Sequence, residues 1–250
     1  DFFRGGVPLE MRGSLSATAQ LRGGWSISVT PSLTSDRFDS TSYASYYLAR
    51  SHGAATDTVK FQPGPTVKSV QWQGRISTPQ FSRFAANINS TYGTDAEYLE
   101  SARATRLDVS ANLDLRPTSK IRMTATMLHQ EFRRERDKSA ILMTNIPRIR
   151  VEYQLARTML VRFVGQYENR TRDAYRDPVT SAPILFRDAV GAFTTSARTV
   201  TNAMRADWLF AYLPTPGRVI YVGYGASLTQ TDPFSFSDRP ERTSDGTFVN

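Results

Sequence analysis

The chain has 250 residues, of which 40% are hydrophobic (AVILMFWYC), 22% are charged and none is cysteine, so a disordered polyampholyte, a disulfide-stapled secreted domain and a thiolate metal site are excluded. The net charge is +8, but the basic excess is spread along the chain and its densest run, 133–138, is interrupted by acids, so no nucleic-acid partner is expected. Mean hydropathy is −0.40, and no apolar run approaches the ~18–20 residues of a membrane helix.

Strict alternation of apolar and polar residues predicts β-strands along most of the chain. From Met11 to Arg22 the odd positions are apolar or small and the even positions are polar, and the pattern resumes over 25–33 after Gly23-Gly24, which predicts a hairpin. The same alternation predicts strands over 70–76, 84–88, 107–115, 121–127, 149–155, 161–167, 204–212 and 220–228. No amphipathic helical pattern is present, so the sequence predicts an all-β, antiparallel fold.

The connections between the predicted strands alternate between tight turns and longer polar loops. The predicted turns lie around Gly23 and at 77–79, 117–119, 156–158 and 214–217, and the predicted loops cover 34–66, 90–99, 131–146 and 169–199. Outer-membrane barrels place short turns on one rim and longer loops on the other, and their strands need ~9–11 tilted residues to cross. The sequence therefore predicts a transmembrane β-barrel of about ten or more strands, with an apolar belt facing lipid and a polar lumen.

The polar faces of the predicted strands carry charges of both signs, which are expected to pair across strands inside a lumen. These residues are Arg106, Asp108, Asp114, Arg116, Arg122, Arg148, Arg150, Glu152, Arg162, Arg205 and Asp207. Aromatic residues lie near predicted strand ends and indicate either interfacial girdles or the ordinary preference of aromatics for strands. They are Trp25, Tyr98, Tyr153, Tyr167, Tyr212 and Tyr221.

Three segments resemble one bacterial family: the opening 3–9 (FRGGVPL), the hairpin 150–167, and 208–224 (WLFAYLPTPGRVIYVGY), which is the most specific. That family is the outer-membrane β-barrel domain of unknown function found C-terminal to a family-9-like carbohydrate-binding module. The resemblance implies the outer membrane of a diderm bacterium, with membrane lipid and glycan-like solutes as partners, and it implies no established activity. It also implies that residues 1–250 are a fragment of one barrel domain, without the N-terminal module and the final strand.

Few residues point to catalysis or metal binding. His52 and His129 are the two histidines; His129 with a loop acid and a serine could form a hydrolase site at the outer rim, although a plain rim polar residue is the simpler interpretation. Asp232, Asp238 and Asp245 could gather around calcium but lack EF-hand spacing. We therefore assign no catalytic, cofactor-binding or metal residue, and expect no cofactor.

The predicted loop 34–66 contains aromatic residues beside serine, threonine and aspartate, a mixture that suits either sugar recognition or loop packing over a barrel mouth. These aromatics are Phe38, Tyr43, Tyr46 and Tyr47. Gly223 and Gly225 lack the third glycine of a dinucleotide loop and indicate close packing.

The resulting functional prediction is a surface or pore component of the outer membrane that binds or admits glycan-like solutes, rather than an enzyme. Three alternatives remain open. One is the C-terminal part of a TonB-dependent-type transporter barrel, and another is a soluble all-β carbohydrate-binding or lyase domain, which salt or carbonate would release without detergent. The third is an outer-membrane hydrolase, which His129→Ala would inactivate.

Overall fold

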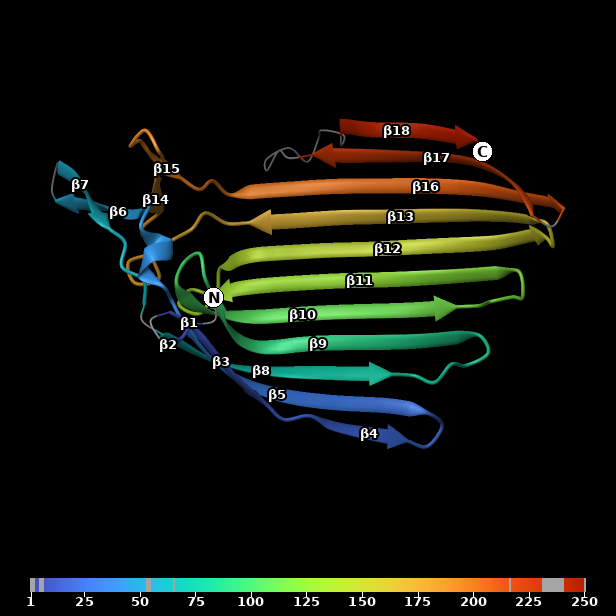
Figure 1. The fold of residues 1–250 in the computed structure, drawn as a ribbon, viewed down its shortest axis with the longest axis horizontal. Helices are drawn as coiled ribbons and strands as arrows, with labels where there is room; N and C mark the ends of the chain where they lie inside the picture. The colour runs from blue at the N-terminus through green and yellow to red at the C-terminus, as the bar shows by residue number, and fades with distance from the viewer. Residues whose placement is uncertain are drawn as a thin grey trace.

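One long antiparallel sheet makes up most of the molecule, and a small second sheet lies at one of its ends (Figure 1). The computed structural model describes residues 3–4, 7–52, 55–64, 66–215, 217–230 and 241–249. The large sheet contains β3 (Glu10–Ser14), β4 (Ala17–Leu21), β5 (Trp25–Arg37), β8 (Thr66–Ser77), β9 (Phe84–Glu97), β10 (Ala102–Leu115), β11 (Ile121–Arg134), β12 (Ala140–Ala156), β13 (Met159–Arg172), β16 (Thr199–Thr215), β17 (Arg218–Gln230) and β18 (Glu241–Val249).

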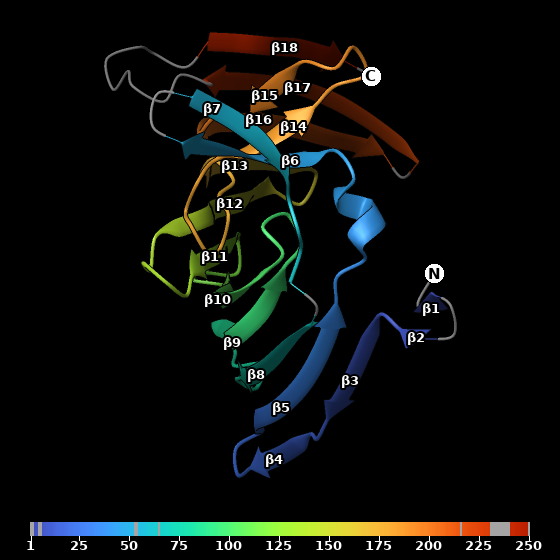
Figure 2. The same cartoon turned by 90° about the vertical axis from the view of Figure 1, so that its left-hand side faces the viewer.

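The strands are ordered β18-β17-β16-β13-β12-β11-β10-β9-β8-β5-β3, and β4 also pairs with β5. Seen end-on, the sheet is curved, with β18 and β4 at its two extremes (Figure 2). In the described part of the chain these edges are not paired with each other, so the described strands form an open sheet rather than a closed barrel. The all-β, antiparallel class is confirmed, and closure stays a prediction.

All ten predicted strands are present, but two predicted loops are wrong. Most of 90–99 and 131–146 belongs to strands, because β9 continues to Glu97, β11 continues to Arg134 and β12 begins at Ala140. The alternation fades there because residues on both faces are polar, although the backbone ladder continues. The tight turns nevertheless lie at one end of the sheet and the longer connections at the other, as predicted (Figure 1).

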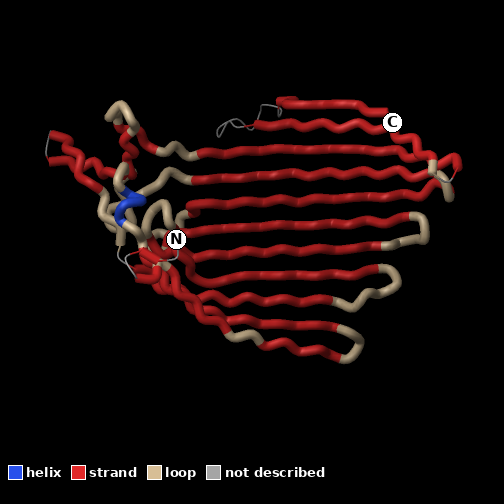
Figure 3. The backbone as a smooth tube through the Cα atoms, in the orientation of Figure 1, coloured by secondary structure: helices blue, strands red, loops and turns tan. Residues whose placement is uncertain are grey.

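The two remaining long connections, 38–65 and 173–198, meet in the second sheet. This sheet is ordered β15-β14-β6-β7 and comprises β6 (Tyr46–His52), β7 (Ala55–Lys60), β14 (Ile184–Arg187) and β15 (Phe193–Thr195). We call it, together with the adjoining 3₁₀ helix η1 (Ser40–Tyr43), the loop cap; η1 is drawn in blue in Figure 3. A further short pair, β1 (Phe3–Arg4) with β2 (Val7–Pro8), lies near the N-terminus.

The large sheet has one apolar and one polar face. Apolar side chains of the first face are solvent-exposed, including Trp25, Trp72 and Trp208 at 37%, 54% and 43% exposure, and no second layer covers them within the described residues. The hydrophobic core is located in and around the loop cap. The sheet is therefore a single layer whose apolar face lacks a protein partner in this structure.

The apolar face forms a belt of limited height. On β5, β10 and β16 the apolar run covers 25–33, 107–115 and 204–212, each about 26 Å long at about 3.3 Å per residue. These three runs do not lie in one hydrogen-bonded row. The row from Val29 passes through six strands and reaches β16 at Asn202, six residues short of Trp208, the centre of the run on that strand.

That offset measures the tilt of the strands relative to the belt. Six residues are about 20 Å, and seven inter-strand spacings of about 4.8 Å are about 34 Å, so the strands are inclined by about 30°. The same offset is visible as a staircase of turn ends from β4 to β16 in Figure 1. Stagger of this kind is what closing a tilted sheet into a barrel requires. At this inclination the belt is about 23 Å high, against about 25 Å for outer-membrane barrels.

No helix in the described part of the chain has the length and apolarity needed to span a membrane.

Candidate functional site: an arginine-rich hollow on the polar face

The charged residues expected on the polar faces do share one face, because the register places them at even steps along adjoining strands. Over β9, β10 and β11 these charges are paired. Arg106 contacts Asp95 and Asp108 at 2.6 Å each, and Arg122 contacts Asp114 at 2.6 Å. Cross-strand pairing, predicted from the sequence, is confirmed for this part of the face.

Over β12, β13 and β16 the polar face carries more positive than negative charge. Four arginines gather there: Arg148, Arg150, Arg162 and Arg205. Arg150 bonds Glu152 on its own strand, whereas Arg148, Arg162 and Arg205 have no carboxylate within 4.0 Å in the part of the chain that the structure describes. The prediction of cross-strand charge pairing is therefore wrong for these three residues.

Register explains why the arginines are close to one another. Arg148 and Arg205 both lie opposite Gln166, one on each side of it, so their Cα atoms are about 10 Å apart. Arg162 lies opposite Glu152, four residues along β13 from Gln166. If the guanidinium groups were as far apart as these Cα atoms, their charges would repel by about 0.4 kcal/mol in water and about 1.7 kcal/mol at an effective dielectric of about 20. The arrangement has an unbalanced positive charge.

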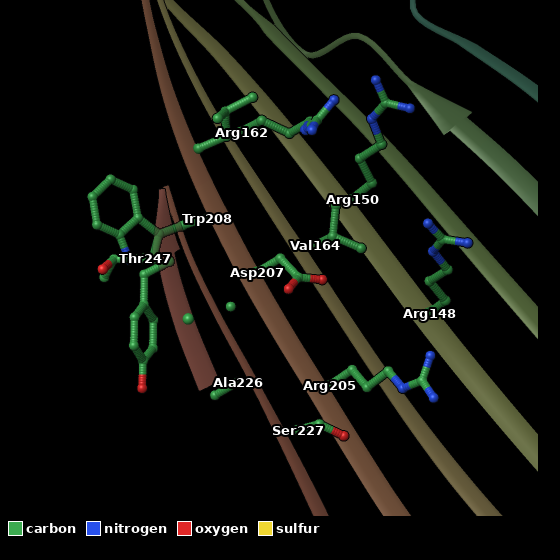
Figure 4. Close-up of a pocket in the computed structure, with 14 residues that line it drawn as sticks. Arg148, Arg150, Arg162, Val164, Arg205, Asp207, Trp208, Ala226, Ser227 and Thr247 are labelled. Atoms are coloured by element: carbon green, nitrogen blue, oxygen red, sulfur yellow. The ribbon is translucent and has the colours of Figure 1, made fainter. Parts of the chain in front are cut away.

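Figure 4 shows these arginine side chains on one side of the sheet and Trp208 on the other, as the two-residue period requires. Asp207 lies among them, but no ion pair within 4.0 Å joins it to any of them in the described part of the chain. Its carboxylate rests over Gly225, where a Cβ would overlap Asp207 Oδ1. The glycine therefore permits a close approach, which agrees with the sequence-based interpretation of Gly225 as a packing residue.

The arginines border a hollow of about 770 Å³. Small residues form part of its lining: Val164, Gly225, Ala226 and Gly246. An open hollow with several uncompensated guanidinium groups is suited to binding oxyanions, because each guanidinium presents a planar fork of donors that matches two anionic oxygens.

The loop cap is held by aromatic packing. Phe38 and Tyr43, at 6% and 5% exposure, are buried with Phe61 and Ile184, and Tyr46 stacks edge-on against Phe186 from the other long connection. Of the two interpretations of the 34–66 aromatics, the structure supports loop packing for Phe38 and Tyr43, because buried rings cannot form a sugar platform.

Burial at the base of this cap raises the pKa of two phenols, Tyr43 and Tyr98. Tyr43 donates to the backbone oxygen of Tyr98, and Tyr98 donates to Asp36 Oδ1 at 2.9 Å. Burial raises the pKa of Tyr43 to about 12. Burial, followed by the hydrogen bond to Asp36, also raises the pKa of Tyr98 above its usual value.

A buried ion cluster, which the sequence did not indicate, ties the cap to the sheet. Glu100, at 1% exposure in the β9–β10 turn, accepts from Arg134 Nε at 2.9 Å and from the backbone N–H of Arg176 at 3.0 Å. Arg134 also donates to Asp173 at 2.8 Å and to the oxygen of Ala174. These residues are distant in sequence, and no local pattern connects them.

The histidine and acidic candidates do not assemble into a site. His129 lies on the apolar face at the loop-side border of the belt, where its Nδ1 is 2.7 Å from Asn145 Oδ1, and no hydroxyl or carboxylate partner is recorded for it among the described residues. The side chain of His52, like Asp232, Asp238 and the side chain of Asp245, lies outside the described residues. Among the described residues no group of three potential metal ligands is found.

Comparison of the chain with protein-family models gives no match, and comparisons with curated proteins and with solved structures also give none. The resemblance to the outer-membrane barrel family stays a prediction, and function is argued from the geometry.

Proposed function

We propose that this chain is part of an outer-membrane β-barrel in which the apolar face contacts lipid and the polar face lines a path or binding surface for dissolved solutes. The uncovered apolar belt carries this proposal. Water-soluble monomers rarely expose a contiguous apolar patch of more than a few hundred Å², and a soluble β-sandwich would cover this face with a second sheet.

The dimensions of the belt support the same proposal. A height of about 23 Å and an inclination of about 30° lie close to the ~25 Å band and ~35–45° tilt of outer-membrane barrels. The border of the belt is also marked by side chains: Asn145, Asn169 and Asn202 lie in the row of His129, on the loop side of the apolar runs of their strands. Polar side chains are tolerated there because headgroups and water are within reach.

The three tryptophans provide a direct test, since all three lie on the apolar face at different heights. Trp208 is at the middle of the belt, Trp72 is displaced toward the loop end and Trp25 is at the turn end. Each can be studied alone after the other two are replaced by phenylalanine. The full chain is reconstituted into vesicles whose lipids carry bromine either deep in the acyl chains or near the headgroups.

Deep bromine is expected to quench fluorescence in the order Trp208, Trp72, Trp25, and shallow bromine in the reverse order. Aqueous iodide serves as the control and is expected to quench all three weakly. Strong quenching by iodide without quenching by either bromolipid would refute the membrane proposal and favour a soluble domain whose apolar face binds another protein.

A further inference from the structure

We infer that the hollow beside Arg148, Arg150, Arg162 and Arg205 is a binding site for small dissolved anions with two or more oxyanion groups, such as polycarboxylates or phosphate esters. This inference deepens the proposed function, because it names the solute class that the polar face would recognise.

Arginines on the same polar face differ in whether a carboxylate pairs with them. Arg106 and Arg122 are held by Asp95, Asp108 and Asp114, so their charge is already compensated. Arg148, Arg162 and Arg205 have no such partner among the described residues. Among the described residues, these two arginines of β10 and β11 are thus compensated, whereas three of the four arginines that border the 770 Å³ hollow are not.

The spacing of Arg148 and Arg205 favours a solute with more than one anionic group. Arg148 and Arg205 are separated by one strand, about 10 Å at the backbone, and Gln166 lies between them with an amide that can donate to a bound oxygen. A monovalent ion offers one charge to two guanidinium groups, whereas a solute with two anionic groups can give each guanidinium its own bidentate partner. This favours multivalent anions over chloride.

The position of the arginines favours a dissolved solute over a lipid headgroup as the ligand. Arg205 lies on the face opposite the belt, in the stretch of β16 that also contains Trp208, and the other three arginines lie on the neighbouring strands β12 and β13 (Figure 4). A headgroup would have to leave the bilayer surface to reach them, whereas a dissolved solute would not.

The test measures binding of citrate and of inorganic pyrophosphate to the full chain in neutral detergent by calorimetry. Replacing Arg148 and Arg205 together by glutamine is expected to weaken both affinities at least tenfold. Arg122→Gln is the matched control, since it removes an arginine from the same face that already has a carboxylate partner, and it is expected to change the affinities less than twofold. Replacing Arg148 and Arg205 by lysine retains the charge in case the glutamine variant fails to fold, and a threefold or greater loss is expected because the bidentate fork is lost.

No citrate or pyrophosphate binding by the parent chain, or equal losses in the Arg148/Arg205 and Arg122 variants, would overturn the inference. Citrate binding that disappears when phosphatidylglycerol is added to the micelles would overturn it in favour of a lipid-headgroup site. Tryptophan quenching by bromolipids is read separately. If the parent chain binds no anion but is quenched by bromolipids, only the inference is contradicted; if it binds anions but is not quenched, only the membrane proposal is contradicted.

Discussion

Glu100→Gln tests whether the buried ion cluster fixes the loop cap to the sheet. The substitution preserves shape but replaces a carboxylate oxygen with an amide that donates, so Arg134 Nε and Nη2 lose their acceptor charge in a buried site. Removing one partner of a buried pair costs about 3–5 kcal/mol. Asp173 still compensates Arg134 at 2.8 Å, so we expect a smaller loss of about 2–3 kcal/mol.

Local opening of the cap is the appropriate readout, because the cluster joins the strand ends of the large sheet to the segment that leads into the cap. Hydrogen exchange should accelerate about 30- to 150-fold at the amides of Asp173 and Ile184, which bond the oxygens of Ile141 and Tyr175. Glu135→Gln is the control at the same end of the sheet: its pair with Arg103 is solvent-exposed, so exchange should change less than about fivefold. Equal effects of the two substitutions, or none for Glu100→Gln, would refute the reasoning.

Two further predictions concern the cap and the sheet. Folding raises the pKa of Tyr43 to about 12 from its usual 10.0, so the unfolded chain releases this proton first as pH rises, and the free energy of unfolding should fall between pH 10 and pH 12. Phenolate absorbance and denaturant midpoints are measured against pH in the parent and in Tyr43→Phe. An identical pH dependence in the two proteins would contradict this prediction. Gly93→Ala should lower the yield of folded protein, because a Cβ there would overlap the backbone oxygen of Val70 and separate β8 from β9. Gly74→Ala is the control and should not lower the yield, because the space around Gly74 is open. Equal yields of the two variants in a refolding assay would contradict this prediction.

The sequence predicted the faces of the sheet better than the contacts between strands. Alternation depends only on the two-residue period of a strand, so it identified each belt strand and placed Arg148 and Arg205 on the polar face. Which residues share a row depends on the register between strands. Shifting a neighbouring strand by two residues preserves every face but changes every pair, and for this reason the uncompensated arginines could not be distinguished from the compensated ones.

The loop cap could not be predicted for a related reason. β6 and β14 pair across more than a hundred residues of chain, and their short lengths give too few alternations to be recognised. Similarly, Glu100, Arg134 and Asp173 are brought together only by the ends of three separate elements. Isolated charged residues of this kind usually indicate solvent-exposed positions, and only the fold shows that Glu100 is buried.

Belt and arginine hollow depend on a single register. Between β13 and β16, Phe163 pairs with Trp208 on the apolar face while Gln166 pairs with Arg205 on the polar face. A slip of one residue would turn Arg205 toward the belt and Trp208 toward the polar face. In a bilayer such a slip is opposed by up to about 2–4 kcal/mol for each arginine moved toward the midplane. Lipid contact on one face would thereby hold the cationic side chains together on the other, at a position where their mutual repulsion would otherwise favour separation.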